Sequence, residues 1–207
     1  MRTLVIASQK GGVGKTTIAG HLAVMAESCG AGPVALIDTD PQGSLSSWWN
    51  ERQAETPAFA SVEIGSLETH LKQLEKAGVK LAIIDTPPAV TETIRKVLAV
   101  ADLVLIPTRP SPHDLRAVGS TVEMVEAAGK RMVFVINGAA QRAKITGEAA
   151  IALSQHGTVA PVTLYQRTDF AASMIDGRSA QEIDSTSRSA GEISDLWIYV
   201  SAQLRKK

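Results

Sequence analysis

A glycine-rich loop with two lysines follows the first apolar run of the chain. Residues 9–17 read QKGGVGKTT, and they lie between the apolar residues 4–7 and an amphipathic stretch that starts at residue 18. Glycines let backbone N–H groups turn inward around an anion, and the N-terminus of a following helix adds a partial positive charge. This phosphate loop (residues 9–17) therefore predicts a nucleoside triphosphate site. The residues expected around the phosphates are Gly11, Gly12, Val13, Gly14, Lys15, Thr16 and Thr17.

Two side chains of the loop could do more than shape its backbone. Lys15 can reach the β- and γ-phosphates of a nucleotide, and the hydroxyl of Thr16 can bind Mg²⁺. The alternative is a glycine-rich turn with an incidental lysine. The order of strand, glycine loop and helix favours the phosphate site.

Carboxylates follow two other apolar runs. Asp38 and Asp40 come after residues 34–37, and Asp85 comes directly after residues 81–84. The carboxyl ends of parallel strands form the edge at which doubly wound sheets bind ligands. Asp85 is therefore predicted to hold Mg²⁺ through water. For any one of these aspartates, a cap at a strand end is the alternative.

The phosphate loop departs from the common G-x-x-x-x-G-K-[ST] pattern. Gln9 replaces the first glycine, and a second lysine, Lys10, follows it. Residues 10–16 thereby resemble the deviant Walker A loop of the ParA/MinD group of P-loop ATPases. The resemblance implies binding of ATP and ADP, and a homodimer in which Lys10 reaches the nucleotide of the partner subunit, so that hydrolysis depends on dimerisation. A solvated lysine, or one that acts within its own subunit, is the alternative.

The same resemblance implies roles for the aspartates of residues 38–42, which read DTDPQ. This segment is similar to the family's switch I, so Asp40 is expected to orient the attacking water. Asp38 is expected to support the metal site. Residues 86–88 match the family's switch II position, which can sense the γ-phosphate.

Asn137 follows the apolar run at residues 132–136. It resembles the asparagine that contacts adenine in this family. The N/T-K-x-D motif of common GTPases is absent from the sequence. An asparagine that forms a turn before Gly138 is the alternative interpretation.

The elements that must position these residues are short apolar runs with helical segments between them. Consecutive apolar residues, rather than alternating ones, indicate strands that are covered on both faces. We therefore expect an α/β fold with a doubly wound, mostly parallel β-sheet flanked by helices, as in P-loop NTPases, in a single domain of residues 1–207. Ser111 and Pro112 predict the start of one helix, and Gly30 and Gly129 predict the ends of two. The expected strands contain residues 4–7, 34–37, 81–84, 103–106 and 132–136.

The composition excludes several classes of protein. The chain has 207 residues, 44% of them apolar, and its 21 Lys and Arg balance its 21 Asp and Glu. No apolar stretch reaches the roughly 20 residues of a membrane span, and the N-terminal residues do not resemble a signal peptide. Cys29 is the only cysteine, so an internal disulfide, a zinc site of cysteines and an iron–sulfur cluster are excluded. A lone cysteine indicates a reducing, cytoplasmic location.

These absences exclude some subgroups of the family that the sequence resembles. Iron–sulfur relatives need clustered cysteines, and we do not expect the N-terminal helix-turn-helix domain of larger plasmid ParA proteins, because the first strand is expected to begin at residue 3. We therefore predict a short ParA-like partition ATPase, similar to plasmid ParA and ParF proteins. The resemblance implies non-specific DNA binding in the ATP state, association with the nucleoid, and stimulation by a ParB- or ParG-like partner. A MinD-like membrane-associated regulator, or an ATPase that positions carboxysomes or chemoreceptor arrays, is the alternative.

The last part of the sequence bears on these alternatives. A MinD-like protein is expected to end in a detachable basic amphipathic helix. Here the apolar positions have helical spacing, which favours a helix packed on the sheet over contact with a membrane. The positions of this stripe are Ile193, Leu196, Trp197, Val200 and Leu204.

Basic residues after the last strand are candidates for DNA contacts. Non-specific binding uses lysines and arginines that contact phosphates. Arg167 and Arg178 lie in the region that resembles the family's segment after its last strand, and Arg142, Lys144 and Arg188 are further candidates. For each of them, a solvated or salt-bridged surface residue is the alternative.

Overall fold

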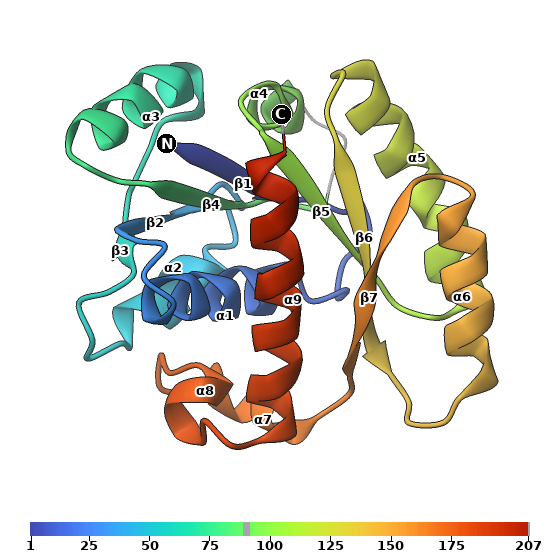
Figure 1. The fold of residues 1–207 in the computed structure, drawn as a ribbon. Coiled ribbons are helices and arrows are strands. Elements are labelled where there is room, and N and C mark those ends of the chain that lie inside the picture. The colour runs from blue at the N-terminus through green and yellow to red at the C-terminus, as the bar shows by residue number, and fades with distance from the viewer. Residues whose placement is uncertain (89–91, 207) are drawn as a thin grey trace.

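The computed structural model describes residues 1–88 and 92–206 (Figure 1). Within these residues, one sheet contains seven strands in the order β3-β2-β4-β1-β5-β6-β7, and every neighbouring pair is parallel. The predicted doubly wound α/β fold is confirmed. The strands are β1 (Arg2–Ile6), β2 (Val34–Asp38), β3 (Ala58–Phe59), β4 (Leu81–Asp85), β5 (Leu103–Thr108), β6 (Met132–Ala139) and β7 (Thr158–Tyr165).

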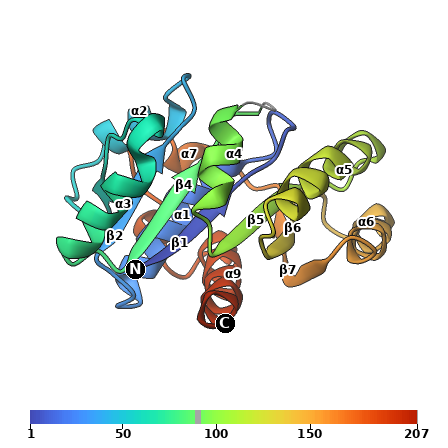
Figure 2. The same ribbon diagram turned by 90° about the horizontal axis from the view of Figure 1, so that it is seen from above.

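Helices cover both faces of the sheet (Figure 2). One apolar core lies between the sheet and α1, α2 and α9, and the other lies between the sheet and α3, α4, α5 and α6. Short helices α7 and α8 precede α9 at the end of the molecule where the phosphate loop lies. The helices are α1 (Lys15–Ser28), α2 (Ser44–Asn50), α3 (Leu67–Lys76), α4 (Glu92–Ala99), α5 (Pro112–Ala127), α6 (Lys144–Ser154), α7 (Thr168–Ser173), α8 (Ala180–Ile183) and α9 (Arg188–Arg205), with a 3-10 turn at Ile64–Ser66.

The five expected strands all form, because their consecutive apolar residues are buried from both faces. Every residue of β4 and β5 is buried. Two strands were not among the expected runs. The two-residue β3 lies at one edge of the sheet, and β7 lies at the other. Strand β7 is partly exposed and contains Pro161, which an edge strand tolerates because one side needs no partner.

The predicted helix boundaries are confirmed at three positions. The hydroxyl of Ser111 accepts a hydrogen bond from the backbone N–H of Asp114 at 3.1 Å, and Pro112 is the first residue of α5. Gly30 and Gly129 follow α1 and α5 with φ angles of 72° and 64°. This left-handed backbone ends a helix without strain because glycine has no Cβ.

Helix α9 packs on the sheet through the apolar stripe that the sequence predicts. All five stripe residues are buried, and they belong to the core that also contains α1. Val200 and Leu196 are fully inaccessible to solvent, whereas Ile198 on the opposite face is 62% exposed. No helix in the described part of the chain is long and apolar enough to cross a bilayer.

Truncating the stripe should destabilise the whole fold. We expect Leu196→Ala to lower the free energy of unfolding by about 3 kcal/mol, because it removes a buried side chain and leaves a cavity. Urea denaturation followed by circular dichroism measures this change. Ile198→Ala in the same helix is the control, and it should change stability by less than about 0.5 kcal/mol. Equal effects of the two substitutions would contradict the packing of α9.

Candidate nucleotide-binding site

The phosphate loop connects β1 to α1 at the carboxyl edge of the sheet. Gly12 and Gly14 have φ angles of 74° and 91°, so both need the left-handed backbone that favours glycine. Lys15 begins α1, and its ammonium lies 3.4 Å from the carbonyl oxygen of Lys10. The loop therefore wraps back over the start of the helix, where backbone N–H groups are free to bind an anion.

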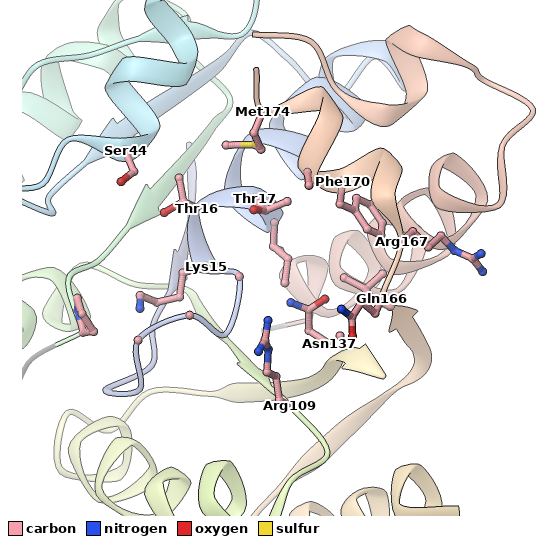
Figure 3. A pocket seen from close by; sticks show the side chains of 18 of the residues that line it. Lys15, Thr16, Thr17, Ser44, Arg109, Asn137, Gln166, Arg167, Phe170 and Met174 are labelled. Carbon is pink, nitrogen blue, oxygen red and sulfur yellow. The ribbon is translucent and has the colours of Figure 1, made fainter. Parts of the chain in front are cut away.

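An open cavity of about 600 Å³ lies beside the loop (Figure 3). One end is lined by Gly11, Gly12 and residues 14–18, together with Asp40. The far end is formed by the last residues of β7 and by residues that follow it. Seven residues line the cavity there, namely Leu164, Tyr165, Gln166, Arg167, Phe170, Ala171 and Met174. The cavity thus has one polar end at the phosphate loop and one largely apolar end.

Lys15 is a cation in a buried position. It is 7% exposed, and burial lowers the pKa of its ammonium, while Asp85 and Asp40 act in the opposite direction. A buried ammonium that is only partly balanced by carboxylates attracts an additional anion. The polar end of the cavity therefore favours a ligand with phosphate groups.

Asp85 ends β4 and is 1% exposed. One of its oxygens accepts a hydrogen bond from the hydroxyl of Thr16 at 2.5 Å, and the other accepts from the backbone N–H of Thr86 at 3.0 Å. Burial raises the pKa of the Asp85 carboxyl to about 7, and the negative charge of Asp38 adds to this rise. A nearby cation would hold this carboxylate in its charged form.

These donors fit a magnesium ion. Carboxylate and hydroxyl oxygens are the ligands that Mg²⁺ takes, with water and substrate phosphates completing its shell. No group of three or more His, Cys, Asp or Glu side chains in the described residues is arranged to hold a metal alone. The pair of Thr16 and Asp85 therefore fits a metal that enters with a nucleotide rather than a permanently bound one.

Asp38 and Asp40 have different surroundings although they are two residues apart. Asp38 pairs in register with Asp85 on the neighbouring strand, and its oxygens accept hydrogen bonds from the backbone N–H groups of Asp40, Leu45 and Ser46, each at 3.0 Å. Asp38 therefore shapes the turn and the start of α2. Asp40 lines the cavity, where its oxygen accepts from the N–H of Gln42 at 3.0 Å.

Asn137 lies near the end of β6 and lines the cavity. Its side-chain amide donates a hydrogen bond to the carbonyl of Val13 in the phosphate loop at 2.6 Å. The pairing of β6 with β7 shifts between Asn137 and Ala139, and Gly138 has a φ angle of 65°. The asparagine thus lies at a strand irregularity, where it connects β6 to the loop.

Three further predicted residues, Lys10, Arg167 and Arg178, lie in the phosphate loop, just before α7, and between α7 and α8. Lys10 is exposed and makes no ion pair within the described residues. Arg167 is largely buried against Glu192, with its Nε 2.9 Å from the carboxylate, and this contact raises the pKa of the guanidinium. Arg178 is exposed and pairs with Asp176 at 2.8 Å. Both Arg167 and Arg178 are therefore salt-bridged in this structure, and their contacts with DNA stay a prediction.

Several residues that line the cavity were not predicted from the sequence. Arg109 follows β5 and points toward the phosphate loop, and Phe170 and Met174 lie on α7 and just after it (Figure 3). Arg109 could have been found, because it follows a strand that ends at the same edge as Asp85. Gln166, Phe170 and Met174 follow β7, which was not among the expected strands.

The loop should not tolerate a side chain at Gly14. A Cβ built there lies 2.3 Å from the amide nitrogen of Asn137, and the φ angle of 91° strains any other residue. We expect Gly14→Ala to weaken ATP binding at least about tenfold, because the loop must move away from its anion-binding geometry. Isothermal titration calorimetry measures the affinity.

The control is Gly191→Ala in α9, where a Cβ meets no atom within 4 Å. This variant should bind ATP as the wild type does. Unchanged affinity in Gly14→Ala would contradict the role of the loop.

Comparison with known proteins places this site in a family. Residues 4–180 match the family model described as "CobQ/CobB/MinD/ParA nucleotide binding domain". The chain belongs to the ParA/MinD family. The expected resemblance is thereby confirmed over the part of the chain that contains the phosphate loop, Asp40, Asp85 and Asn137.

Individual members of the ParA/MinD family match over most of the chain. "Maintenance of carboxysome distribution protein A" from Halothiobacillus neapolitanus is 31% identical over 201 residues, which cover 92% of this chain and 91% of that protein. "Protein ParA" from Rhizobium radiobacter is 30% identical over 183 residues, covering 83% and 82%. The structure of an ATP complex of a McdA variant from Cyanothece superposes with a TM-score of 0.81 at 21% identity, covering 100% of this chain and 97% of the other, and so shares the fold.

Proposed function

We propose that this protein is a ParA-like ATPase that binds ATP with Mg²⁺, dimerises around the nucleotide, and uses slow hydrolysis to time its release from DNA. The observation that carries this proposal is the meeting of Lys15, Thr16 and Asp85 at one end of a cavity that Asp40 also lines. Membership of the ParA/MinD family supports ATP as the nucleotide.

The residues around the phosphates would have different roles in binding and hydrolysis. Lys15 and the backbone of the phosphate loop hold the β- and γ-phosphates, and Thr16 with Asp85 holds Mg²⁺. The metal ion neutralises charge on the phosphate oxygens when it is bound. Asp40 accepts a hydrogen bond from the attacking water and orients it. Asp38 keeps Asp40 in place through its bonds to the turn and to α2.

Dimerisation would complete the site through Lys10. This lysine is exposed, so a second subunit that docked on the loop would meet its ammonium. A lysine supplied in trans adds positive charge where negative charge develops during hydrolysis, as an arginine finger does. ATP binding and dimerisation would therefore occur together, and cleavage of the γ-phosphate would end the ATP state and let the two subunits separate.

The cargo is proposed to be DNA, bound without sequence preference and linked to a ParB- or ParG-like partner. A relative named "Protein ParA" at 30% identity supports this choice. The carboxysome is the second candidate, because the relative with 31% identity over 92% of the chain is named for carboxysome distribution. A MinD-like membrane function is disfavoured by the burial of the α9 stripe in the core.

Fluorescence anisotropy with labelled DNA duplexes tests the proposal. Two unrelated sequences should bind equally in the presence of Mg²⁺ and ATP, and neither should bind with ADP or without nucleotide. The logarithm of the association constant should fall linearly with the logarithm of the salt concentration, because counterions are released from DNA. Binding that is independent of nucleotide would contradict the proposal. ATP-dependent sedimentation with liposomes in the absence of DNA would favour the MinD-like alternative.

Arg178 is the better of the two predicted arginine contacts. Its pair with Asp176 is exposed on both sides, and such pairs exchange readily for a phosphate. We expect Arg178→Glu to weaken DNA binding and to reduce the salt slope by about 1, with the affinity for ATP unchanged. Salt titration of the DNA complex measures this slope.

Arg167→Glu gives a less direct test, because it also places a carboxylate against Glu192. For Arg178→Glu, an unchanged salt slope would show that Arg178 does not contact DNA.

A further inference from the structure

His21 is a buried histidine in α1 that the site described above does not use. It is 1% exposed, and it lies one helical turn after Thr17. Its Nδ1 is 2.7 Å from the carbonyl oxygen of Thr17, which can only accept a hydrogen bond, so Nδ1 carries the hydrogen. Nε2 is then an acceptor, and it receives the backbone N–H of Ala180 at 3.1 Å. The imidazole is therefore a neutral bridge between α1 and α8.

The same ring also contacts α7. The hydroxyl of Ser173 lies 3.1 Å from Nε2, and the ring of Phe170 packs edge-on with centroids 5.3 Å apart and an interplanar angle of 74°. The hydroxyl of Ser173 also lies 3.0 Å from the carbonyl oxygen of Phe170, and its single hydrogen is shared between that oxygen and Nε2. His21 thus holds the segment that carries Phe170 and Met174 against α1.

These contacts join the two ends of the cavity. Thr17, whose carbonyl accepts from His21, lines the polar end that the phosphate loop forms. Phe170 and Met174 line the apolar end. Phe170 lies in α7 and Met174 directly follows it, and His21 supplies polar contacts between α1 and both α7 and α8.

We propose that His21 is a positioning residue for the apolar end of the cavity, where the nucleoside of ATP would lie. It fixes α7 and α8 on α1 through its Nε2 acceptor and so places the residues that form this end. This inference rests on the proposed binding of ATP. His21 does not reach into the cavity itself, so it acts through Phe170 and Met174. The phosphate end, built from the loop and Asp85, does not depend on this acceptor.

The surroundings keep the imidazole in the form that this role needs. Burial lowers the pKa of His21 to about 4, with the Thr17 carbonyl and Glu182 acting to raise it and Arg52 acting to lower it. Glu182 and Arg52 form an ion pair at 2.8 Å, so their effects on the ring largely oppose each other. A protonated ring would direct an Nε2–H at the Ala180 N–H, and the bridge to α8 would be lost.

Two substitutions separate the acceptor from the rest of the ring. Glutamine can place an amide oxygen near the position of Nε2, whereas asparagine is too short to reach Ala180 but can still donate to Thr17. Leaving the buried Ala180 N–H without a partner should weaken ATP binding about tenfold in His21→Asn, and His21→Gln should stay within about threefold of the wild type. His21→Leu removes both contacts and should behave as His21→Asn does.

The test measures binding of ATP and of inorganic tripolyphosphate by calorimetry, together with KM and kcat for hydrolysis. We expect His21→Asn to raise KM about tenfold while kcat changes less than about twofold, and to leave tripolyphosphate affinity unchanged because that probe needs only the phosphate end. Equal ATP affinities for the Asn and Gln variants would overturn the inference. An equal loss of tripolyphosphate affinity would overturn it too, since the residue would then support the whole fold.

A failure of the proposed function gives a different result. If the wild type bound neither ATP nor tripolyphosphate, both the proposed function and this inference would fall. If the wild type bound ATP and all three variants did as well, only the role of His21 would be wrong. Circular dichroism of each variant establishes that it is folded before the titrations.

Discussion

Replacing Lys15 with glutamine is expected to weaken ATP binding by at least about 100-fold, because two charge-assisted hydrogen bonds to phosphate are each worth about 1.5–3 kcal/mol. The side chain is 7% exposed, and the negative charges of Asp85 and Asp40 act on its ammonium. Without its charge, two carboxylates face the site where phosphates would bind. Isothermal titration calorimetry with ATP and Mg²⁺ measures the loss.

Lys10→Gln is the matched control in the same loop. Lys10 is exposed, and it contacts Lys15 through its backbone carbonyl, which the substitution keeps. The affinity of the monomer for ATP should therefore stay within about threefold of the wild type. Hydrolysis should fall, because the proposed role of Lys10 is in the partner's site. Wild-type ATP affinity in Lys15→Gln would place the phosphate site elsewhere.

Asp40→Ala should separate binding from hydrolysis. We expect the rate of hydrolysis to fall by about 100-fold or more, because the attacking water loses the carboxylate that orients it. ATP binding should persist, since Lys15, Thr16 and Asp85 are unchanged. The variant should therefore accumulate as an ATP-bound dimer, which size-exclusion chromatography with ATP and Mg²⁺ would show as an earlier elution than with ADP.

Asp176→Ala is the control for this experiment. Asp176 is an exposed aspartate that pairs with Arg178 and does not line the cavity. Its removal should leave hydrolysis and elution as in the wild type. If Asp40→Ala hydrolysed ATP at the wild-type rate, the residue that positions water would have to be sought elsewhere on the cavity wall.

Most of the phosphate end could be predicted from the sequence. Gly12 and Gly14 adopt left-handed backbone because their neighbours in the chain require a tight turn before α1, which is a local property. Asp40 and Asp85 were found by a rule that is nearly local. Both follow consecutive apolar residues, and parallel strands that are buried on both faces bring such endings to one edge.

The surroundings of the predicted residues were harder to foresee. The role of Asp38 beside the metal stays a prediction, but its hydrogen bonds to backbone N–H groups up to eight residues later were not foreseen. DNA contact by Arg167 also stays a prediction, and only the structure identifies Glu192 in α9 as its ion-pair partner. Each outcome depends on how a loop or helix packs, and spacing along the chain does not contain that information.

The sequence alone determined the family, the parallel sheet and the phosphate loop, because each is encoded by residues that are close together in the chain. Only the tertiary structure decided what forms the other end of the cavity. Phe170 and Met174 line that end, and behind them His21 of α1 contacts Phe170, Ser173 and Ala180, which lie more than 140 positions later in the sequence. Such contacts depend on the packing of the whole molecule, so no local sequence pattern predicts them.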